Sequence, residues 1–301
     1  MEGRLYVANA GDNSISVVSA GTLRETDRIP LYGGAEGPRA LALRAGWLYH
    51  ADSYSATVGR IHLGDGRQEL LCAGACPTEL CVWGGSLYVA CGESNSVWRL
   101  NRANWTLELC RPVGIFPVGI RAHGGRIWIA ELLGGMLRCL EADSMEEIRR
   151  MDTDGMPLAL DCQGGACYTA VLLPDGHGKI VAFSSQGGVL WQIAQEFPSG
   201  YLQCLRRQKK AVAAHVWDDS FSLIDCEERR VIWTKPCARM PDRILVDEKS
   251  GRMYLSCMQS DVVQAFDLEG ELLAEIPVGR EPRGLALYSP SGFARIESRE
   301  R

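Results

Sequence analysis

The segment RLYVANAGDNSISVVSAGTL, residues Arg4 to Leu23, contains two short apolar runs separated by turn residues, which is typical of a β-hairpin. An isolated hairpin is only marginally stable in water, so this pair needs further strands from elsewhere in the chain. The run LYVA recurs in related forms at intervals of 39 to 44 residues, which indicates a repeat protein. The seven copies begin at Leu5, Leu48, Leu87, Ile127, Cys167, Ala211 and Met253.

A proline late in each unit gives the same count of seven, and each introduces a short apolar run. These marker prolines are Pro38, Pro77, Pro117, Pro157, Pro198, Pro241 and Pro282. Each unit holds four strand-like runs, which in the third unit read SLYVA, SVWRL, TLELC and VGIRA. Four strands in a period of about 40 residues are typical of a β-propeller blade. We therefore expect an all-β, seven-bladed β-propeller with four-stranded antiparallel blades.

The first repeat and the segment IPVGREPRGLALYSPSG, Ile276 to Gly292, resemble the YVTN repeat, a relative of the WD40-type blade. The resemblance covers residues 4–292 and fits repeats one, three and seven best. It implies blades whose innermost strand A is followed outward by strands B, C and D. It implies little about activity, because one fold hosts many functions.

On this alignment the chain opens with strand B and has no strand A before it. The run from Gly284 to Pro290 is a strand A with no blade after it. We expect this C-terminal strand A to join the N-terminal strands B–D and close the ring, which leaves no exposed inner edge. Residues 1–292 would then form a single domain, followed by a short charged tail over residues 293–301.

The composition argues against some partners and compartments. The net charge is −5, whereas nucleic-acid-binding proteins usually carry a basic face, so we expect no nucleic acid. No apolar stretch approaches the length of a membrane span, and the N-terminus lacks the pattern of a signal peptide. We therefore expect a cytoplasmic protein with no membrane partner. Its twelve cysteines lie mostly in apolar runs, and most of them are interpreted as reduced core residues.

Propellers carry their D–A and B–C loops on one face, around the mouth of the central channel, and function on this fold usually lies there. Apolar residues in these loops gather in blades four to seven. They are Phe116, Met156, Phe197 and Met240 before the marker prolines, and Leu132, Leu133, Leu172, Leu173 and Trp217 in the B–C loops. Such a patch favours a protein or peptide partner, with a small ligand also possible. The alternative is that the residues before the prolines plug the channel.

A second ring is formed by the residue that follows each LYVA-like run. Of its members, Asp52, Glu131, His215 and Cys257 could together hold one divalent metal ion, because carboxylates, imidazole and thiolate are metal ligands. The alternative is that each side chain caps its own strand. Arg39 and Arg283 follow marker prolines in neighbouring blades. An anion could lie between these arginines, although this arginine is common in the repeat, which favours a structural role.

Two functions follow from these patterns. We expect a non-catalytic binding scaffold without a cofactor, which presents its channel-mouth loops to a protein, peptide or small ligand. The alternative is a metal-assisted lyase or hydrolase at the mouth of the channel. No nucleophile elbow, phosphate-binding loop or dinucleotide fingerprint is present in the sequence, which favours the scaffold.

Overall fold

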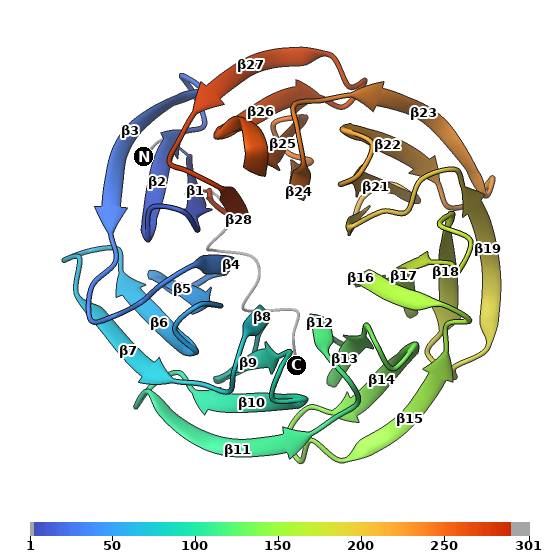
Figure 1. The fold of residues 1–301 in the computed structure, drawn as a ribbon, viewed down its shortest axis with the longest axis horizontal. Coiled ribbons are helices and arrows are strands. Elements are labelled where there is room, and N and C mark those ends of the chain that lie inside the picture. Colours follow the sequence, from blue (N-terminus) through green and yellow to red (C-terminus); the bar gives the residue numbers. More distant parts are fainter. Residues whose placement is uncertain (1–2, 290–301) are drawn as a thin grey trace.

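The computed structural model describes residues 3–289, which form seven four-stranded antiparallel sheets around a central axis (Figure 1). We call the region along this axis the channel. The predicted seven-bladed propeller is confirmed. The described residues contain no α-helix, and their helical turn is the 3-10 turn η1 at Met258–Ser260. In this range no helix is long and apolar enough to cross a membrane. The expected tail over residues 293–301 lies outside the described residues.

The inner strands of each blade are strand A beside the channel and strand B next to it. The A strands of blades 1 to 7 are β28 (Pro282–Tyr288), β4 (Pro38–Arg44), β8 (Pro77–Trp83), β12 (Pro117–His123), β16 (Met156–Gln163), β20 (Tyr201–Leu205) and β24 (Pro241–Asp247). The B strands are β1 (Arg4–Asn9), β5 (Trp47–Asp52), β9 (Ser86–Cys91), β13 (Arg126–Glu131), β17 (Ala166–Leu172), β21 (Lys210–His215) and β25 (Arg252–Cys257).

The outer strands C and D complete each blade, with strand D on the rim (Figure 1). The C strands are β2 (Ser14–Ser19), β6 (Thr57–His62), β10 (Ser96–Asn101), β14 (Met136–Glu141), β18 (Gly178–Ser184), β22 (Ser220–Asp225) and β26 (Val262–Asp267). The D strands are β3 (Arg24–Pro30), β7 (Gln68–Cys72), β11 (Thr106–Pro112), β15 (Glu147–Asp152), β19 (Val189–Gln195), β23 (Arg230–Pro236) and β27 (Leu272–Pro277).

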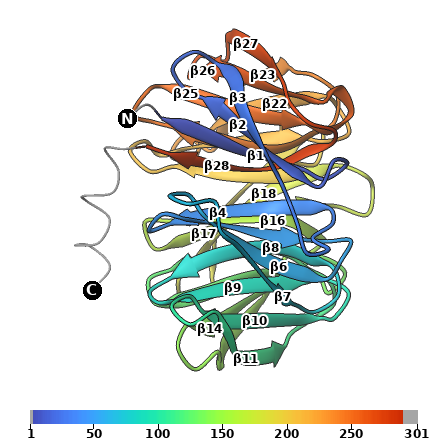
Figure 2. The same cartoon turned by 90° about the vertical axis from the view of Figure 1, so that its left-hand side faces the viewer.

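Blade 1 is assembled from both ends of the described chain, as predicted. Its strand order is β28-β1-β2-β3, and β28 pairs antiparallel with β1 through Leu5 opposite Leu287 and Val7 opposite Leu285. Figure 2 shows these two strands side by side although they lie at opposite ends of the colour scale. The opening hairpin therefore obtains its missing inner strand from the end of the chain.

The LYVA run is continuously apolar because strand B is buried on both faces. Leu5 and Val7 of β1 pack into a cluster shared with blade 7, and Tyr6 and Ala8 pack into a cluster shared with blade 2. Successive side chains of a strand point to opposite faces, so a strand between two neighbours needs apolar residues at every position. Seven such clusters, one between each pair of neighbouring blades, form the core.

The twelve cysteines all lie within the described range, and all are free thiols in the structure. Six of them are buried in the core, whereas Cys72 and Cys110 are exposed on the outer strands β7 and β11. The expectation that most cysteines are core residues holds for these six, whereas Cys72 and Cys110 are exposed because strand D has solvent on its outer side.

The D–A and B–C loops lie together on one end of the ring, which we call the loop face. Backbone hydrogen bonds join them, for example from Leu132 N to Phe116 O at 3.0 Å and from Met258 N to Met240 O at 2.9 Å. Phe116 and Met240 have left-handed backbone conformations, with φ of 56° and 55°. Their amides donate to Asn95 and Asp219 in the B–C turns of the preceding blades. Neighbouring blades therefore fix each other's loops.

Candidate functional site

The predicted apolar loop residues are exposed to different degrees. Trp217 and Leu133 have exposed fractions of 62% and 57%, and those of Phe197 and Met156 are 38% and 36%. Ile115, which the sequence reasoning did not select, is 54% exposed in the same D–A loop as Phe116. We call the five exposed residues, which lie on the loops of blades 4 to 6, the apolar sector.

The other predicted members are partly buried and support these loops. They are Phe116, Leu132, Leu172, Leu173 and Met240. Met156 pairs with Leu172 at the start of β16, and a side chain at Gly155 would meet Leu173, so the D–A and B–C loops of blade 5 are packed together. None of the residues before the marker prolines lines the channel cavity of about 280 Å³.

Acidic side chains lie close to the apolar sector in the sequence and on the same loops. Asp154, Asp175 and Glu196 are exposed, and Asp218 is partly exposed next to Trp217. Lys179 Nζ is 3.2 Å from Asp154 Oδ2, but the Asp154 side chain still has an exposed fraction of 95%. The loops of this sector therefore carry large apolar side chains with carboxylates beside them.

The residues of the predicted metal ring end the B strands and are buried. Asp52 Oδ1 is 2.8 Å from His50 Nδ1, and Asp52 Oδ2 accepts a hydrogen bond from Thr57 at 2.9 Å. Glu131 forms an ion pair with Arg138 and accepts a hydrogen bond from Gly114 N at 2.8 Å. Each carboxylate is therefore already held by groups of its own blade and the loop before it.

The other two predicted ligands are held in the same way. His215 Nε2 is 2.7 Å from Ser222 Oγ, and burial lowers the pKa of His215, which favours the neutral ring. Cys257 Sγ lies 3.8 Å from Leu255 O. Among residues 3–289 no three His, Cys, Asp or Glu side chains are grouped so that they could hold a metal ion. The structure thus does not group Asp52, Glu131, His215 and Cys257 as metal ligands, because each side chain is held at the end of its own B strand.

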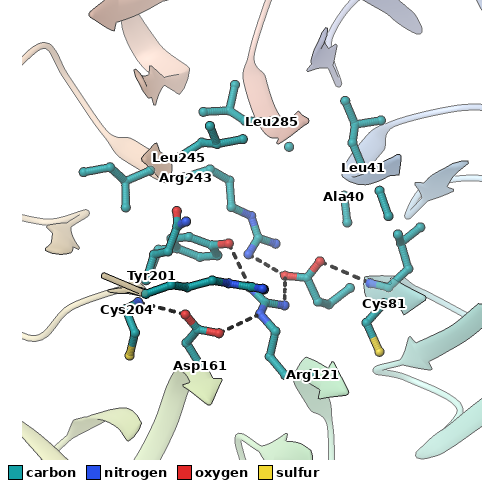
Figure 3. Close-up of a pocket in the computed structure, with 17 residues that line it drawn as sticks. Ala40, Leu41, Cys81, Arg121, Asp161, Tyr201, Cys204, Arg243, Leu245 and Leu285 are labelled. Carbon is teal, nitrogen blue, oxygen red and sulfur yellow. Dashed lines mark hydrogen bonds and ion pairs between the residues drawn. The ribbon is translucent and has the colours of Figure 1, made fainter. Parts of the chain in front are cut away.

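A charged cluster inside the channel is the feature that the sequence reasoning missed (Figure 3). Glu79 of β8 accepts a hydrogen bond from Arg243 of β24 at 2.7 Å and lies 3.3 Å from Arg121 of β12. Arg121 also donates to Tyr201 Oη at 2.8 Å, and its Nε is 3.7 Å from Asp161 Oδ1. Side chains from blades 3 to 7 therefore meet across the channel.

The electrostatics of this cluster keep Glu79 ionised. Burial alone would raise the pKa of Glu79, but Arg243 and Arg121 more than offset burial, and the pKa is below its usual range. Burial raises the pKa of Tyr201, so its phenol stays protonated. The guanidinium of Arg243 also lies over the Tyr201 ring, 4.6 Å from its centroid. The channel therefore holds fixed charges in an environment with little water to screen them.

A cavity of about 280 Å³ opens beside this cluster. Its lining includes Glu79, Arg121, Asp161, Tyr201 and Arg243, together with small residues such as Ala40 and Gly284. This volume is close to the lower end of the range for ligand pockets, roughly 300–1,000 Å³. The cavity could hold a small polar molecule.

The sequence did carry a signal for this cluster. The A-strand runs PTELCV, PVGIRA, PLALDC and PDRILV each contain one or more charged residues in an otherwise apolar strand. Side chains alternate along a strand, so the residues between the buried positions of strand A point the other way. A charged residue at one of these alternate positions therefore points into the channel. Applying this alternation to the A strands would have identified Glu79, Arg121, Asp161 and Arg243.

Comparison with known proteins supports the fold alone. No family model and no curated protein matches the sequence, so membership of the YVTN family stays a prediction. A functionally unknown protein from Desulfotomaculum acetoxidans has a solved structure with a TM-score of 0.80 and 11% identity, covering 95% of this chain and 99% of that chain.

Two further similar structures carry the name of an enzyme. A putative 6-phosphogluconolactonase from Bacteroides fragilis has a TM-score of 0.76 and 14% identity over 96% of this chain and 98% of its own. A second putative 6-phosphogluconolactonase, from Bacteroides uniformis, has a TM-score of 0.74 and 15% identity, with 95% and 99% of the two chains covered. At these identities the likeness shows a shared seven-bladed fold and does not assign an activity.

Proposed function

We propose that this chain is a non-catalytic binding protein that docks a protein or peptide on the loop face of blades 4 to 6. The observation that supports the proposal is the exposure of Ile115, Leu133, Met156, Phe197 and Trp217 on neighbouring loops. Contiguous exposed apolar side chains on a soluble protein mark interaction sites more often than chance. Aromatic residues and methionine are also the types that are enriched in interfaces.

The loops that carry these side chains are held in place, which favours binding. Leu133 N donates to Ile115 O at 3.2 Å, and Leu132 N donates to Phe116 O at 3.0 Å, so the two loops of blade 4 form a small extension of the sheet. Ordering flexible loops costs free energy on association, and a surface that is already ordered avoids part of this cost.

The chemistry of the partner follows from the charges around the patch. Asp154, Asp175, Glu196 and Asp218 lie on the same loops as the apolar sector. A complementary segment would therefore combine apolar or aromatic side chains with lysine or arginine. We propose a basic, amphipathic peptide segment as the partner.

Selection from a displayed peptide library on the immobilised chain tests this proposal. Selected peptides should be rich in basic and aromatic residues, and their affinity should fall at least tenfold in a variant with Leu133→Ser, Phe197→Ser and Trp217→Ser. Tyr54→Ser on the loop face of blade 2 and Leu272→Ser on the rim are matched controls, because both residues are exposed, by 63% and 53%. Peptides that bind the triple variant and the wild type equally would contradict the proposal.

A metal-assisted lyase or hydrolase is the second candidate, favoured by the enzyme names of two similar structures. It has less support, because the four predicted metal ligands lie in different blades and are bonded there. Metal analysis of the purified protein separates the two candidates. One equivalent of bound metal that is lost in His215→Ala would favour the enzyme.

A further inference from the structure

Three arginines from adjacent blades lie near the loop-face end of the channel around a single carboxylate. They are Arg243 of blade 7, Arg283 of blade 1 and Arg39 of blade 2. Asp242 Oδ1 is 3.5 Å from Arg283 Nη1, and Asp242 Oδ2 is 3.6 Å from Arg243 Nε. Both distances exceed the 2.7–3.2 Å typical of an N–H···O hydrogen bond. Asp242 is thus shared loosely between Arg243 and Arg283, and it acts on Arg39 only from a longer distance.

Of the three arginines, Arg39 has the fewest partners that compensate its positive charge. Its Nε is buried without a hydrogen-bond partner, and within residues 3–289 no carboxylate lies at ion-pair distance from its guanidinium. Burial lowers the pKa of Arg39, Asp242 opposes this effect, and Arg243 and Arg283 add to it. Arginine nevertheless stays protonated in proteins. Arg39 is only partly exposed, and a cation in such a position without a close partner is costly, a cost that a bound anion would recover.

Neighbouring groups do not neutralise Arg39. The half-buried thiol of Cys76 lies close enough to interact with it, but burial raises the pKa of Cys76, so this thiol stays neutral. Glu79 is already bonded to Arg243 and paired with Arg121. Asp161 accepts hydrogen bonds from Cys162 N and Cys204 N. In this group the four arginines Arg39, Arg121, Arg243 and Arg283 outnumber the three carboxylates Glu79, Asp161 and Asp242.

A cavity lies next to the strands that carry these arginines. A side chain at Gly284 would lie 2.8 Å from Arg39 O, so β28 and β4 approach closely and hold Arg283 and Arg39 on adjoining strands. The next residues along these strands, Ala40 and Gly284, line the cavity of about 280 Å³ together with Arg243. The cavity therefore begins one residue away from the arginines and continues toward Tyr201 and Gln203.

We propose that the loop-face end of the channel binds a small organic anion. Its carboxylate or phosphate group would be held by Arg39, Arg243 and Arg283, and its hydroxylated body would lie in the cavity beside Tyr201 and Glu79. Planar guanidinium groups with paired donors suit both kinds of oxyanion. This site is separate from the apolar sector of blades 4 to 6 and does not depend on a partner binding there.

Titration of the full chain with defined anions tests the proposal. The probes are inorganic phosphate, glycerol phosphate, succinate and malate, each compared with chloride at constant ionic strength by calorimetry and thermal melting. At least one oxyanion should bind with a dissociation constant of 1 mM or tighter and raise the melting temperature. Comparison of the phosphate and dicarboxylate probes identifies the preferred head group. Absence of any effect beyond chloride up to 50 mM would overturn the proposal.

Variants at the site separate a ligand role from a structural one. Arg39→Gln should weaken binding at least tenfold, and without anion it should melt at the same temperature as the wild type or higher, because it removes an unpartnered cation. Asp242→Asn should strengthen binding about threefold, since it removes the competing carboxylate. Arg239→Gln removes an exposed charge from the same face and should leave binding unchanged.

Two results would assign the arginines a structural role and overturn the proposal. One is a lower melting temperature, or failure to fold, for Arg39→Gln in chloride. The other is an oxyanion effect on melting that is the same in Arg39→Gln, Arg283→Gln and the wild type. Arg39 and Arg283 lie on different strands. A result found with both variants is therefore not due to a local distortion of one strand.

Discussion

The same backbone positions carry different chemistry on the two sides of the loop face. The residue after the marker proline is Val118 in blade 4 and Leu158 in blade 5, but Arg39 in blade 2 and Arg283 in blade 1. The apolar sector leaves its side chains in solvent, whereas the arginine side is largely buried around Asp242. The repeated strands therefore set where side chains are presented, and the sequence of each repeat decides what is presented.

This contrast also predicts how the two sides respond to mutation. Buried charges in the channel depend on one another, so the loss of one leaves its partners unpaired in a medium of low dielectric constant. Exposed apolar side chains lose few contacts when they are shortened. We expect large losses of stability when a paired channel charge such as Glu79 is removed, and small losses in the apolar sector. Arg39, which has no close partner, is the exception on the channel side.

The largest expected effect comes from removing the strand that closes the ring on the arginine side. A chain that ends at Gly279 lacks β28 and Arg283, so β1 loses the partner that it pairs with from Arg4 to Asn9. We expect an insoluble or unfolded product by circular dichroism and size-exclusion chromatography. Deletion of residues 293–301 is the control and should leave the melting temperature unchanged. A chain ending at Gly279 that melts like the full chain would contradict the closed ring.

A smaller effect is expected for Glu79→Ala in the channel. The variant leaves Arg243 and Arg121 without their shared carboxylate, and we expect a loss of about 3–5 kcal/mol in the free energy of unfolding. Trp217→Ala in the apolar sector should change that free energy by less than about 1 kcal/mol. Urea unfolding of both variants checks the contrast, and equal losses would show that the two sides do not differ.

The smallest expected effect is a dependence on pH. The pKa of Glu79 is lower in the folded chain than in the unfolded chain, so its carboxylate stabilises the fold above the unfolded value of about 4.5. This stabilisation should disappear as the pH falls through the folded pKa. Urea unfolding between pH 6 and pH 3 should therefore show a shallower loss for Glu79→Gln than for the wild type.

Glu93→Gln is the control for this measurement, because Glu93 is exposed on the loop face. It should follow the wild-type curve at every pH. Identical slopes for Glu79→Gln and the wild type would mean that the channel ion pairs do not contribute to acid stability.

Much of the fold could be predicted because short segments of sequence identify each repeat. The period of LYVA and of the marker prolines gave the number of blades, and the phase of the two markers gave the closure by β28. Each signal depends on a few adjacent residues, such as Leu5 to Ala8, whose pattern is set by burial between two blades. Burial of this kind is visible in sequence without knowledge of distant contacts.

The site was predictable only in part, since it depends on contacts across the ring. Trp217 and Leu133 are exposed as a loop position would suggest, whereas Leu132 and Leu172 pack under their neighbours. The pairing of Glu79 with Arg243 joins residues from blades 3 and 7, which no local pattern connects. Asp52, Glu131, His215 and Cys257 occupy the same position in their repeats. Residues at the same position in different blades lie at different places around the ring.

The pairing of β1 with β28 also orders events during synthesis. Leu5 is synthesised long before its partner Leu287. At about 5–20 residues per second, β1 waits roughly 15–60 s with one edge unpaired. Among the described strands, β1 therefore waits longest for its inner partner, and a chaperone that shields strand edges would act longest on this strand.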